Sequence, residues 1–480
     1  SAYVSQNAAN RYAQAPQVPS RNFWTRGWEN FSIFDLIPGV GCSASLGVNE
    51  SNADAGLSPD ATPRSDAALT DARNRDVVSD TGDTGFQSVC DTYAPFTPLA
   101  PVRPNTPLNN IVLGGPNGEF VCYQEWNWVP ARDPIPGYGS PYVDGYAILN
   151  RVTGAITRLN VIHREDAYAR NCSFSDDGRY VVVLESPHAA GPEQIVLYDL
   201  QDPASPRRIT VTAGNDSSVA GVISSDGTRL YFVSHATDLT SEPNPHGGIF
   251  QYDVRTGRLN RLPLPNVYFN SVEYGIDLNR PALSLSADGR RLAFVAMSSV
   301  TSAIPQIYLA DLETYHISQI SSASNYSALP FTSGTGHRVL FTSSSGGGVF
   351  LWEEGSGLRL VSTAPDGSPL RYGNIGSGIS RDGTRVAMSA QDSRVVPGAW
   401  PTLPGRQDAF TELVVLNLST GRRNLVYQNL CLGIRFGMGA ISADGHFGIG
   451  SFAGFYDRGD ANSFYMYPLL GFSVDHFLNP

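Results

Sequence analysis

The sequence contains no lysine, so all 33 of its basic residues are arginine. A chain without lysine has no P-loop lysine, no kinase-type catalytic lysine and no lysine for a Schiff base. Walker-type ATPases, protein kinases and pyridoxal-dependent enzymes are therefore excluded. The net charge of -11 at pH 7 also argues against a nucleic-acid partner, because binding to a phosphate backbone requires an excess of positive charge.

Long apolar runs are also missing. Every such run is far shorter than the ~18 residues that a membrane helix needs, so we expect no membrane span. The sequence begins at Ser1, without a charged and apolar leader, which fits an exported chain that has lost its signal peptide and equally a chain trimmed for another reason. We therefore expect a secreted or periplasmic protein of the cell envelope.

Cysteine is scarce, with five widely spaced residues: Cys42, Cys90, Cys122, Cys172 and Cys431. No CxxC or zinc-ligand spacing occurs, so neither haem nor zinc is predicted and we expect no cofactor. An exported protein of this kind is expected to carry one or two disulfides. Cys42–Cys90 is the most natural pair, although the pairing stays open. A G-x-S-x-G motif is absent too, which gives an α/β-hydrolase no support.

Residues 1–107 are predicted to form an irregular N-terminal arm. Residues 45–86 are rich in Ser, Asp, Ala, Gly and Thr and show little periodicity, and five prolines between Tyr93 and Pro107 predict an extended linker. Asp80 and Asp83 are weak candidates for calcium ligands, because two acids in a loop fall far short of an EF-hand; a solvated loop is the simpler interpretation. We expect the arm to lie on its own chain or on a neighbouring subunit.

From residue 108 the sequence repeats. Pro281–Ala296 predicts a strand, a tight Asp288-Gly289 turn and a second strand, because Leu283 and Leu285 alternate with small polar residues. Similar turns recur along the chain, and three of their glycines, 289, 336 and 383, are 47 residues apart. The turn glycines are Gly118, Gly178, Gly227, Gly289, Gly336, Gly383 and Gly445. Each hairpin is followed by a third strand and usually by a short fourth one.

Four antiparallel strands in each repeat are typical of a β-propeller blade. The sequence therefore predicts an all-β fold, a seven-bladed β-propeller over residues 108–480, preceded by the arm. The last unit leaves two alternatives for its outermost strand. That strand comes either from the C-terminal tail near Phe472 or from part of residues 1–107, which would then close the ring.

One repeat carries a resemblance to a known family. The stretch 223–239 (ISSDGTRLYFVSHATDL), together with 250–257 (FQYDVRTG), resembles the TolB-like, WD40-like (PD40) propeller repeat. The resemblance covers about residues 108–480 and implies the propeller fold more strongly than any function. Proteins that look like this include periplasmic scaffolds, secreted proteins of unknown role, peptidase accessory domains and some polysaccharide lyases.

The lyase alternative has candidate residues. A lyase that acts on an acidic polysaccharide needs a cation that neutralises the uronate, a base that removes the α-proton and an acid that protonates the leaving oxygen. His163, Tyr168 and Arg170 provide these residue types within a short stretch. The competing interpretation is structural, because arginine and tyrosine are common at a propeller mouth.

Aromatic residues give a second candidate surface. The connections between second and third strands are long in the first, sixth and seventh units, which are contiguous in a closed ring. Their aromatic residues are Trp126, Trp128, Tyr138, Trp400, Phe455 and Tyr456. Exposed aromatic rings bind sugars or proteins, whereas rings that pack on each other or under the arm are structural.

We therefore predict an exported, non-enzymatic propeller that acts as a binding or assembly scaffold for a protein or glycan partner. The arm is a candidate for clasping a neighbouring copy or another protein. The alternative is a propeller-type polysaccharide lyase that acts on uronate-containing glycans.

Overall fold

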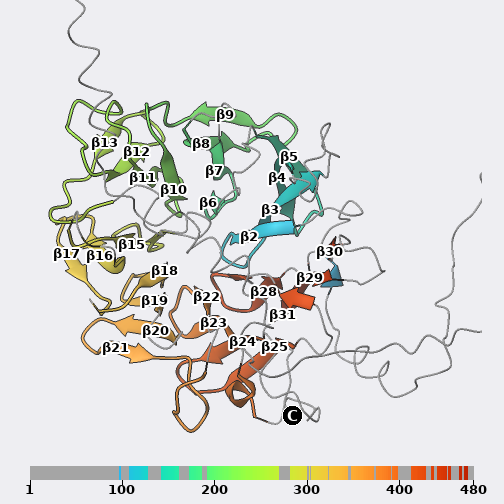
Figure 1. The fold of residues 1–480 in the computed structure, drawn as a ribbon. Coiled ribbons are helices and arrows are strands. Elements are labelled where there is room, and N and C mark those ends of the chain that lie inside the picture. Colours follow the sequence, from blue (N-terminus) through green and yellow to red (C-terminus); the bar gives the residue numbers. More distant parts are fainter. Residues whose placement is uncertain are drawn as a thin grey trace, which may run out of the picture. The chain divides into compact units, whose positions relative to one another are not determined.

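The repeats form antiparallel β-sheets in the computed structural model (Figure 1). The structure describes residues 97–98, 108–127, 142–161, 172–185, 192–269, 282–299, 302, 304–322, 324–343, 348–371, 375–390, 392–397, 412–428, 434–436, 440–450, 452–455, 464–466 and 470–473. The chain divides into two units, Ser1–Val89 and Cys90–Pro480, and all the described residues belong to the second.

Six sheets each consist of four consecutive strands, in the order in which they follow along the chain. The first three sheets are β2 (Leu108–Gly114), β3 (Phe120–Asn127), β4 (Tyr142–Asn150) and β5 (Ile156–Asn160); β6 (Ser173–Phe174), β7 (Tyr180–Glu185), β8 (Gln194–Asp199) and β9 (Arg207–Thr210); and β10 (Ser218–Ile223), β11 (Arg229–Ser234), β12 (Gly248–Asp253) and β13 (Leu259–Arg261).

The next three sheets are β14 (Leu283–Leu285), β15 (Arg291–Ala296), β16 (Gln306–Asp311) and β17 (Ile317–Gln319); β18 (Ser327–Thr332), β19 (Arg338–Ser343), β20 (Gly348–Glu353) and β21 (Gly357–Leu360); and β22 (Ile375–Ile379), β23 (Arg385–Ala390), β24 (Glu412–Asn417) and β25 (Arg423–Gln428). A 3-10 helix, η3 (Ser393–Val395), lies between β23 and β24. Within the described residues, no helix combines the length and the apolar character needed to cross a membrane.

The prediction of an all-β propeller is confirmed, but the predicted number of seven blades is not, because the structure has six blades of this kind. In the last unit, the chain leaves the sheet after β28 (Phe447–Gly450). It then adds β29 (Phe452–Phe455) and β30 (Phe464–Met466) to a separate three-stranded sheet that begins with β26 (Ile434–Phe436). Four consecutive strands therefore cannot form one blade there.

The last unit still contributes to a four-stranded sheet. Its order is β27 (Ala440–Ile441), β28, β31 (Leu470–Ser473) and β1 (Thr97–Pro98). Thr97 pairs with Gly471 and Pro98 with Leu470, so the outermost strand comes from the segment that the sequence predicts to be an extended linker. Of the two alternatives for this strand, the structure shows the N-terminal one.

The innermost strands stand side by side around one axis. β2 contacts β6, β6 contacts β10, and the series continues through β14, β18 and β22 to β27, which also contacts β2. The core lies between adjacent sheets, where Phe232, Phe250 and Phe294 are fully buried. Burial of each such ring stabilises the fold by roughly 2–3 kcal/mol, so stacking of the sheets supplies the core that one sheet lacks.

A repeated hydrogen-bond pattern forms the turn between the first and second strands. In the turn between β14 and β15, Ser286 Oγ donates to Asp288 Oδ1 at 2.6 Å and accepts from the Arg291 amide at 2.9 Å. The turn glycine, Gly289, has a φ of +69°. The same Ser–Asp bond recurs in four further turns: Ser175–Asp177, Ser224–Asp226, Ser380–Asp382 and Ser442–Asp444. These aspartates therefore stabilise the turns, because an aspartate side chain can accept hydrogen bonds from nearby backbone amides.

One disulfide, Cys122–Cys172, connects the first two blades. Cys122 lies in β3, Cys172 directly precedes β6, and both residues are buried. A cross-link across 50 residues of sequence contributes about 4 kcal/mol in the chain-entropy model. The sequence prediction of a disulfide is therefore confirmed, with this pair; Cys42, Cys90 and Cys431 lie outside the described residues.

Candidate functional site

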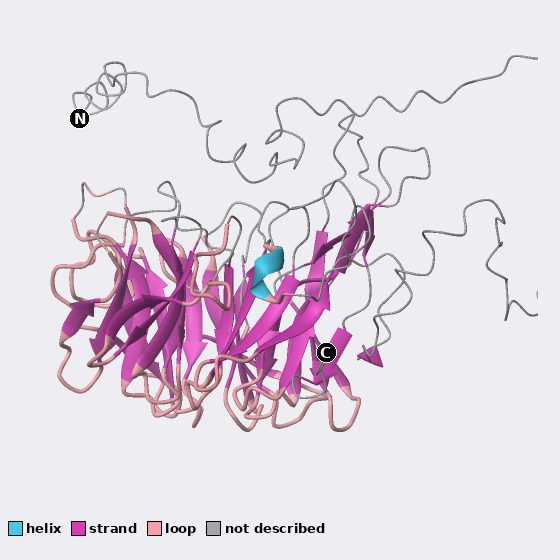
Figure 2. Cartoon of the chain, turned by 90° about the horizontal axis from the view of Figure 1, so that it is seen from below, coloured by secondary structure: helices cyan, strands magenta, loops and turns pink. Residues whose placement is uncertain are grey.

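The strand order gives the propeller two different faces. Connections between first and second strands and between third and fourth strands reach one face, which we call the turn face. Connections between second and third strands and from one blade to the next reach the opposite face, which we call the loop face. Figure 2 shows the strands running between two such faces.

Two of the six predicted aromatic residues, Trp126 and Phe455, lie in described strands. Trp126 is the second-last residue of β3 and pairs with Val143, and Phe455 ends β29 and pairs with Phe464. The structure therefore gives the strands of these two residues, and it places Phe455 in the three-stranded sheet rather than in a blade. Trp128, Tyr138, Trp400 and Tyr456 lie outside the described residues, so a cluster of the six side chains stays a prediction.

The predicted catalytic and calcium-binding residues also lie outside the described residues: His163, Tyr168, Arg170, Asp80 and Asp83. Among the residues that the structure does describe, no group of three or more His, Cys, Asp or Glu side chains is placed to hold a metal ion.

The third blade contains the most fully described part of the loop face. Its two connections, 211–217 and 235–247, are joined by reciprocal bonds around Asn215. The Asn215 amide donates to Asp238 Oδ1 at 2.8 Å, and Asn215 Oδ1 accepts from the Thr237 amide at 3.0 Å. These bonds fix the relative position of the two connections, so this part of the loop face has a defined shape.

Two histidines of this region differ in their surroundings. His235 is half-buried, and its pKa is lowered by this burial even though nearby Asp216 acts in the opposite direction. His246 is exposed and lies edge-on to the Tyr268 ring, with 5.6 Å between the ring centroids.

At the loop-face end of the second and fourth blades, a glutamine side chain and a hydroxyl group bond the third strand to the segment after the fourth strand. We call this arrangement the lock. Gln194 begins β8, and its Oε1 accepts from Thr212 Oγ1 at 2.6 Å. Gln306 begins β16, and its Oε1 accepts from Ser321 Oγ at 2.6 Å. Each hydroxyl also accepts from a strand amide at 2.9 Å, so the third strand is bound to the residue that follows the fourth strand.

The third blade lacks this lock, because Gly248 stands where the second and fourth blades have glutamine; the fifth blade has Gly348 at the same position. Asn244 and Arg261 face the space of the missing side chain: a Cβ at Gly248 would lie 2.7 Å from Arg261 Nε and 3.1 Å from Asn244 Oδ1. Asn244 is only 3% exposed, and its Nδ2 donates to the Ser234 and Ala236 carbonyls at 3.0 Å. Within the described part of the chain, its Oδ1 and the Arg261 Nε have no hydrogen-bond partner.

This Asn244–Arg261 site offers one acceptor and one donor beside a glycine. It contains no nucleophile and no carboxylate, so it gives no support to a catalytic role. Sequence reasoning missed both residues. The available signal is that the third blade has Gly248 where the second and fourth blades have Gln194 and Gln306.

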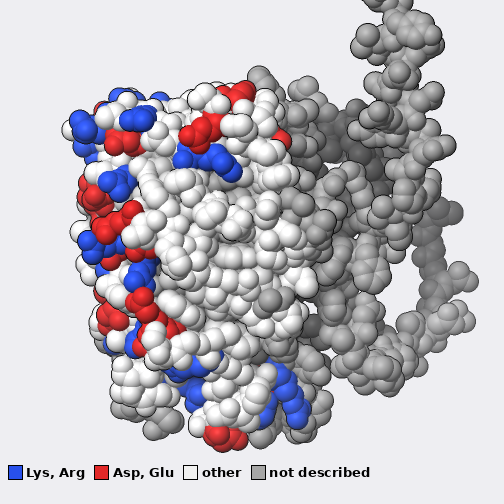
Figure 3. Space-filling model, turned by 90° about the vertical axis from the view of Figure 1, so that its left-hand side faces the viewer, with Lys and Arg blue, Asp and Glu red and all other residues white. Residues whose placement is uncertain are grey.

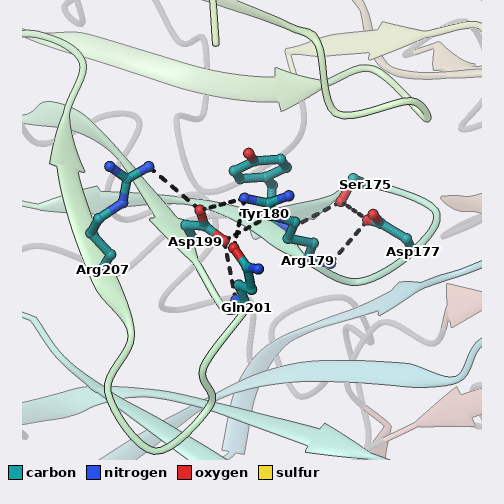
Figure 4. Close-up of polar contacts among 7 residues, drawn as sticks. All are labelled: Ser175, Asp177, Arg179, Tyr180, Asp199, Gln201 and Arg207. Atoms are coloured by element: carbon teal, nitrogen blue, oxygen red, sulfur yellow. Dashed lines mark hydrogen bonds and ion pairs between the residues drawn. The ribbon is translucent and has the colours of Figure 1, made fainter. Parts of the chain in front are cut away.

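The turn face carries charge that is mostly bound in local networks. In the second blade, Arg179 Nε and Nη2 donate to the two Asp199 oxygens at 2.9 and 3.0 Å, and Arg207 Nη2 lies 3.4 Å from Asp199 Oδ2 (Figure 4). Asp199 is buried, and the hydrogen bond from Arg179 lowers its pKa. A carboxylate held ionised by two arginines cannot act as a general acid at neutral pH.

Charged side chains are distributed unevenly over the surface. In Figure 3 they lie along the left edge and in smaller groups at the top and bottom of the view, while the middle of this side carries no charge. Ion pairs of the turn face include Arg290–Glu313 at 3.1 Å, Arg291–Glu354 at 3.0 Å and Arg338–Glu353 at 2.5 Å. The Arg290–Glu313 pair is exposed on both sides and therefore contributes little to stability, so its main effect is on the surface potential.

Comparison with known proteins gives similarity in structure but not in sequence. No family model and no curated protein matches the chain. TolB from Acinetobacter baumannii is 15% identical, with a TM-score of 0.37 over 77% of this chain and 78% of that one. An oligogalacturonate lyase from Vibrio parahaemolyticus is 13% identical, with a TM-score of 0.47 over 79% of this chain and 94% of that one.

The β-propeller domain of Cps50 (Swd1) from Myceliophteria thermophila is 14% identical, with a TM-score of 0.44 over 77% of this chain and 98% of that domain. Likenesses this distant assign no activity, so the fold rests on the sheets described above. The chain is an all-β propeller, as its sequence predicts, and its resemblance to the TolB-like, WD40-like (PD40) repeat is carried by residues 223–239 and 250–257.

Proposed function

We propose that this protein is an exported, non-enzymatic scaffold that binds a protein or glycan partner through its loop face. The observation that carries the proposal is the contrast between the two faces. The turn face is fixed by the repeated Ser–Asp turns, whereas the loop face carries the connections that vary most between blades. A rigid frame that presents variable connections on one face is well suited to recognition.

In this proposal the propeller is a ring of seven sheets. The β27–β28–β31–β1 sheet acts as the seventh blade, between β22–β25 and β2–β5. Two contacts across the junction with the first blade support it. The Asp444 amide donates to the Pro116 carbonyl at 2.8 Å, and the Arg151 guanidinium lies 3.2 Å from the centroid of the Phe447 ring. A cation over an aromatic face is attractive, more so where water is excluded.

Export is supported by the disulfide. Cys122–Cys172 is buried between two blades, and structural disulfides persist in oxidising compartments. We therefore place the protein outside the cytoplasm, either secreted or periplasmic. Residues 1–107 are proposed as a second contact region, through which copies of the chain or other proteins assemble.

The partner is proposed to contact the aromatic residues around Trp126 and Trp400. The test measures binding of the full chain to an array of neutral and uronate-containing oligosaccharides. Light scattering measures self-association of the chain separately. Trp126→Ala combined with Trp400→Ala should weaken binding at least tenfold, because aromatic anchors typically contribute 2 kcal/mol or more. Trp352→Ala is the matched control, since Trp352 lies at the turn-face end of β20 and packs against the core.

If the double variant binds as well as the wild-type chain does, the aromatic residues are not the binding surface. The same oligosaccharides also test the lyase alternative, with His163, Tyr168 and Arg170 as its candidate residues. Unsaturated sugar ends absorb ultraviolet light, so their appearance on any uronate polymer would replace the scaffold proposal with a lyase.

A further inference from the structure

The turns between first and second strands are bonded to each other around the axis. The Asp176 amide donates to the Ser225 carbonyl at 2.8 Å, the Gly334 amide to the Arg381 carbonyl at 2.6 Å, and the Arg381 amide to the Ala443 carbonyl at 2.5 Å. Each bond joins neighbouring sheets. The residue that follows the turn serine therefore faces the axis in successive sheets.

Charge at this position is confined to two residues of opposite sign. In six turns the position holds Asp176, Ser225, Ala287, Gly334, Arg381 and Ala443. Arg381 Nη2 lies 2.7 Å from Asp176 Oδ1 and 2.8 Å from Asp176 Oδ2, and 3.5 Å from Ser225 Oγ.

The two charged residues belong to blades that are not neighbours. Asp176 precedes β7 of the second blade, and Arg381 precedes β23 of the sixth. The first blade and the β27–β28–β31–β1 sheet separate them in one direction, and three blades separate them in the other. A direct bond between them therefore spans the axis instead of following the ring.

Gly334 is the residue that makes room for this bond. A Cβ at Gly334 would lie 2.4 Å from Arg381 Cγ and 2.8 Å from the Arg381 carbonyl oxygen. Gly334 does not have a left-handed φ, so the backbone conformation of this turn does not require glycine. Gly334 occupies the variable second position of the Ser-x-Asp-Gly pattern, at the point where the Arg381 side chain passes over the turn, and Thr335 replaces the aspartate of that pattern.

We propose that Arg381 and Asp176 form a latch that closes the axis of the propeller at the turn face. The latch replaces two exposed charges by an ion pair in which Arg381 Nη2 contacts both Asp176 oxygens, and both side chains are about one-third exposed. It leaves the loop face as the side from which a ligand reaches the axis. This inference concerns access to the ring and does not depend on the identity of the partner.

The test measures access to a thiol placed beneath the latch. In the full chain, Ser225→Cys puts a cysteine next to the Arg381 guanidinium, and an uncharged maleimide labels it at a rate read by peptide mass spectrometry. Adding Arg381→Ala should raise that rate about tenfold, and Asp176→Asn should raise it in the same direction, because either change releases the arginine. Ser356→Cys, on an exposed turn of the same face, should react equally fast with and without Arg381→Ala.

Hydrogen exchange gives a second readout, which distinguishes loss of the latch from a change in the stability of the whole propeller. With the latch broken in either variant, exchange should accelerate in peptides 172–185 and 375–390 together, although they belong to separate blades. Arg290→Ala removes an exposed pair of the same face and should change neither peptide. An unchanged labelling rate at Ser225→Cys, or faster exchange in peptide 375–390 alone, would overturn the latch.

Discussion

At the scale of single residues, most charged side chains described here maintain local structure. Asp392 shows this most clearly. It caps η3 by accepting from the Arg394 amide at 3.0 Å, and it also accepts from Arg394 Nη2 at 2.6 Å and from the Arg371 amide at 2.7 Å. Burial alone would raise its pKa, but the bonds from Arg394 and Arg371 outweigh burial and lower the pKa to about 2.

A carboxylate with a lowered pKa makes stability depend on pH in one direction. The contribution of Asp392 is fully present above the unfolded pKa of about 3.9 and disappears as pH falls toward the folded value of about 2. Asp392→Asn should reduce the free energy of unfolding at pH 7 by about 2 kcal/mol and remove part of the loss between pH 5 and 2. Urea unfolding at a series of pH values measures this, with Glu242→Gln, on an exposed loop, as the control.

If Asp392→Asn and the wild-type chain lose stability in parallel between pH 5 and 2, the carboxylate is not held by these bonds.

At the scale of elements, the sequence predicts the hairpins well and their mutual packing poorly. Asp-Gly pairs identify the turns because left-handed glycine and a capping aspartate leave a local signature. The packing between blades leaves no such signature. A Cβ at Gly178 would lie 2.1 Å from the Phe120 ring of the preceding blade, and one at Gly227 would lie 2.8 Å from the Tyr180 ring.

The candidate sites escape prediction from the sequence for the same reason, because their residues come together only in the folded chain. The latch joins residues 205 positions apart in the sequence, and only the degenerate turn at Gly334 hints at it. The Asn244–Arg261 site likewise depends on the comparison of strand ends that become equivalent only in the folded sheets. Motif spacing detects neither site, because each is built from residues that are unremarkable in their local sequence.

Two glycines at the same turn position separate backbone conformation from packing. Gly178 and Gly289 have φ of +67° and +69°, but a Cβ at Gly289 would meet nothing within 4 Å. Gly289→Ala should therefore cost about 1 kcal/mol for the left-handed conformation alone. Gly178→Ala should cost about 2–4 kcal/mol, because it also forces the Phe120 ring away. Chemical denaturation of both variants measures the difference, and equal losses would show that the Phe120 contact is not maintained in solution.

At the scale of the whole molecule, the account depends on how the ring closes. The inner strands follow one another from β2 to β27 and back to β2, and the last sheet obtains its outermost strand from a segment that precedes the first blade. In the proposed ring of seven sheets, β1 comes from before the first blade and β31 from the last unit, so the last sheet is tied to a segment that precedes the first blade and only short sheet edges remain. The sequence does not decide which segment supplies this outermost strand, because a two-residue strand next to several prolines shows no periodicity.

The most direct test of this account compares the melting temperatures of two truncated chains. Removing residues 1–95 keeps β1, whereas removing residues 1–107 deletes it. If β1 closes the last sheet, the shorter truncation should preserve the melting temperature of the propeller unit, and the longer one should lower it by about 4 °C or more, the shift expected for a loss of a few kcal/mol in a chain of this size. Equal melting temperatures for the two truncated chains would contradict closure of the ring by β1.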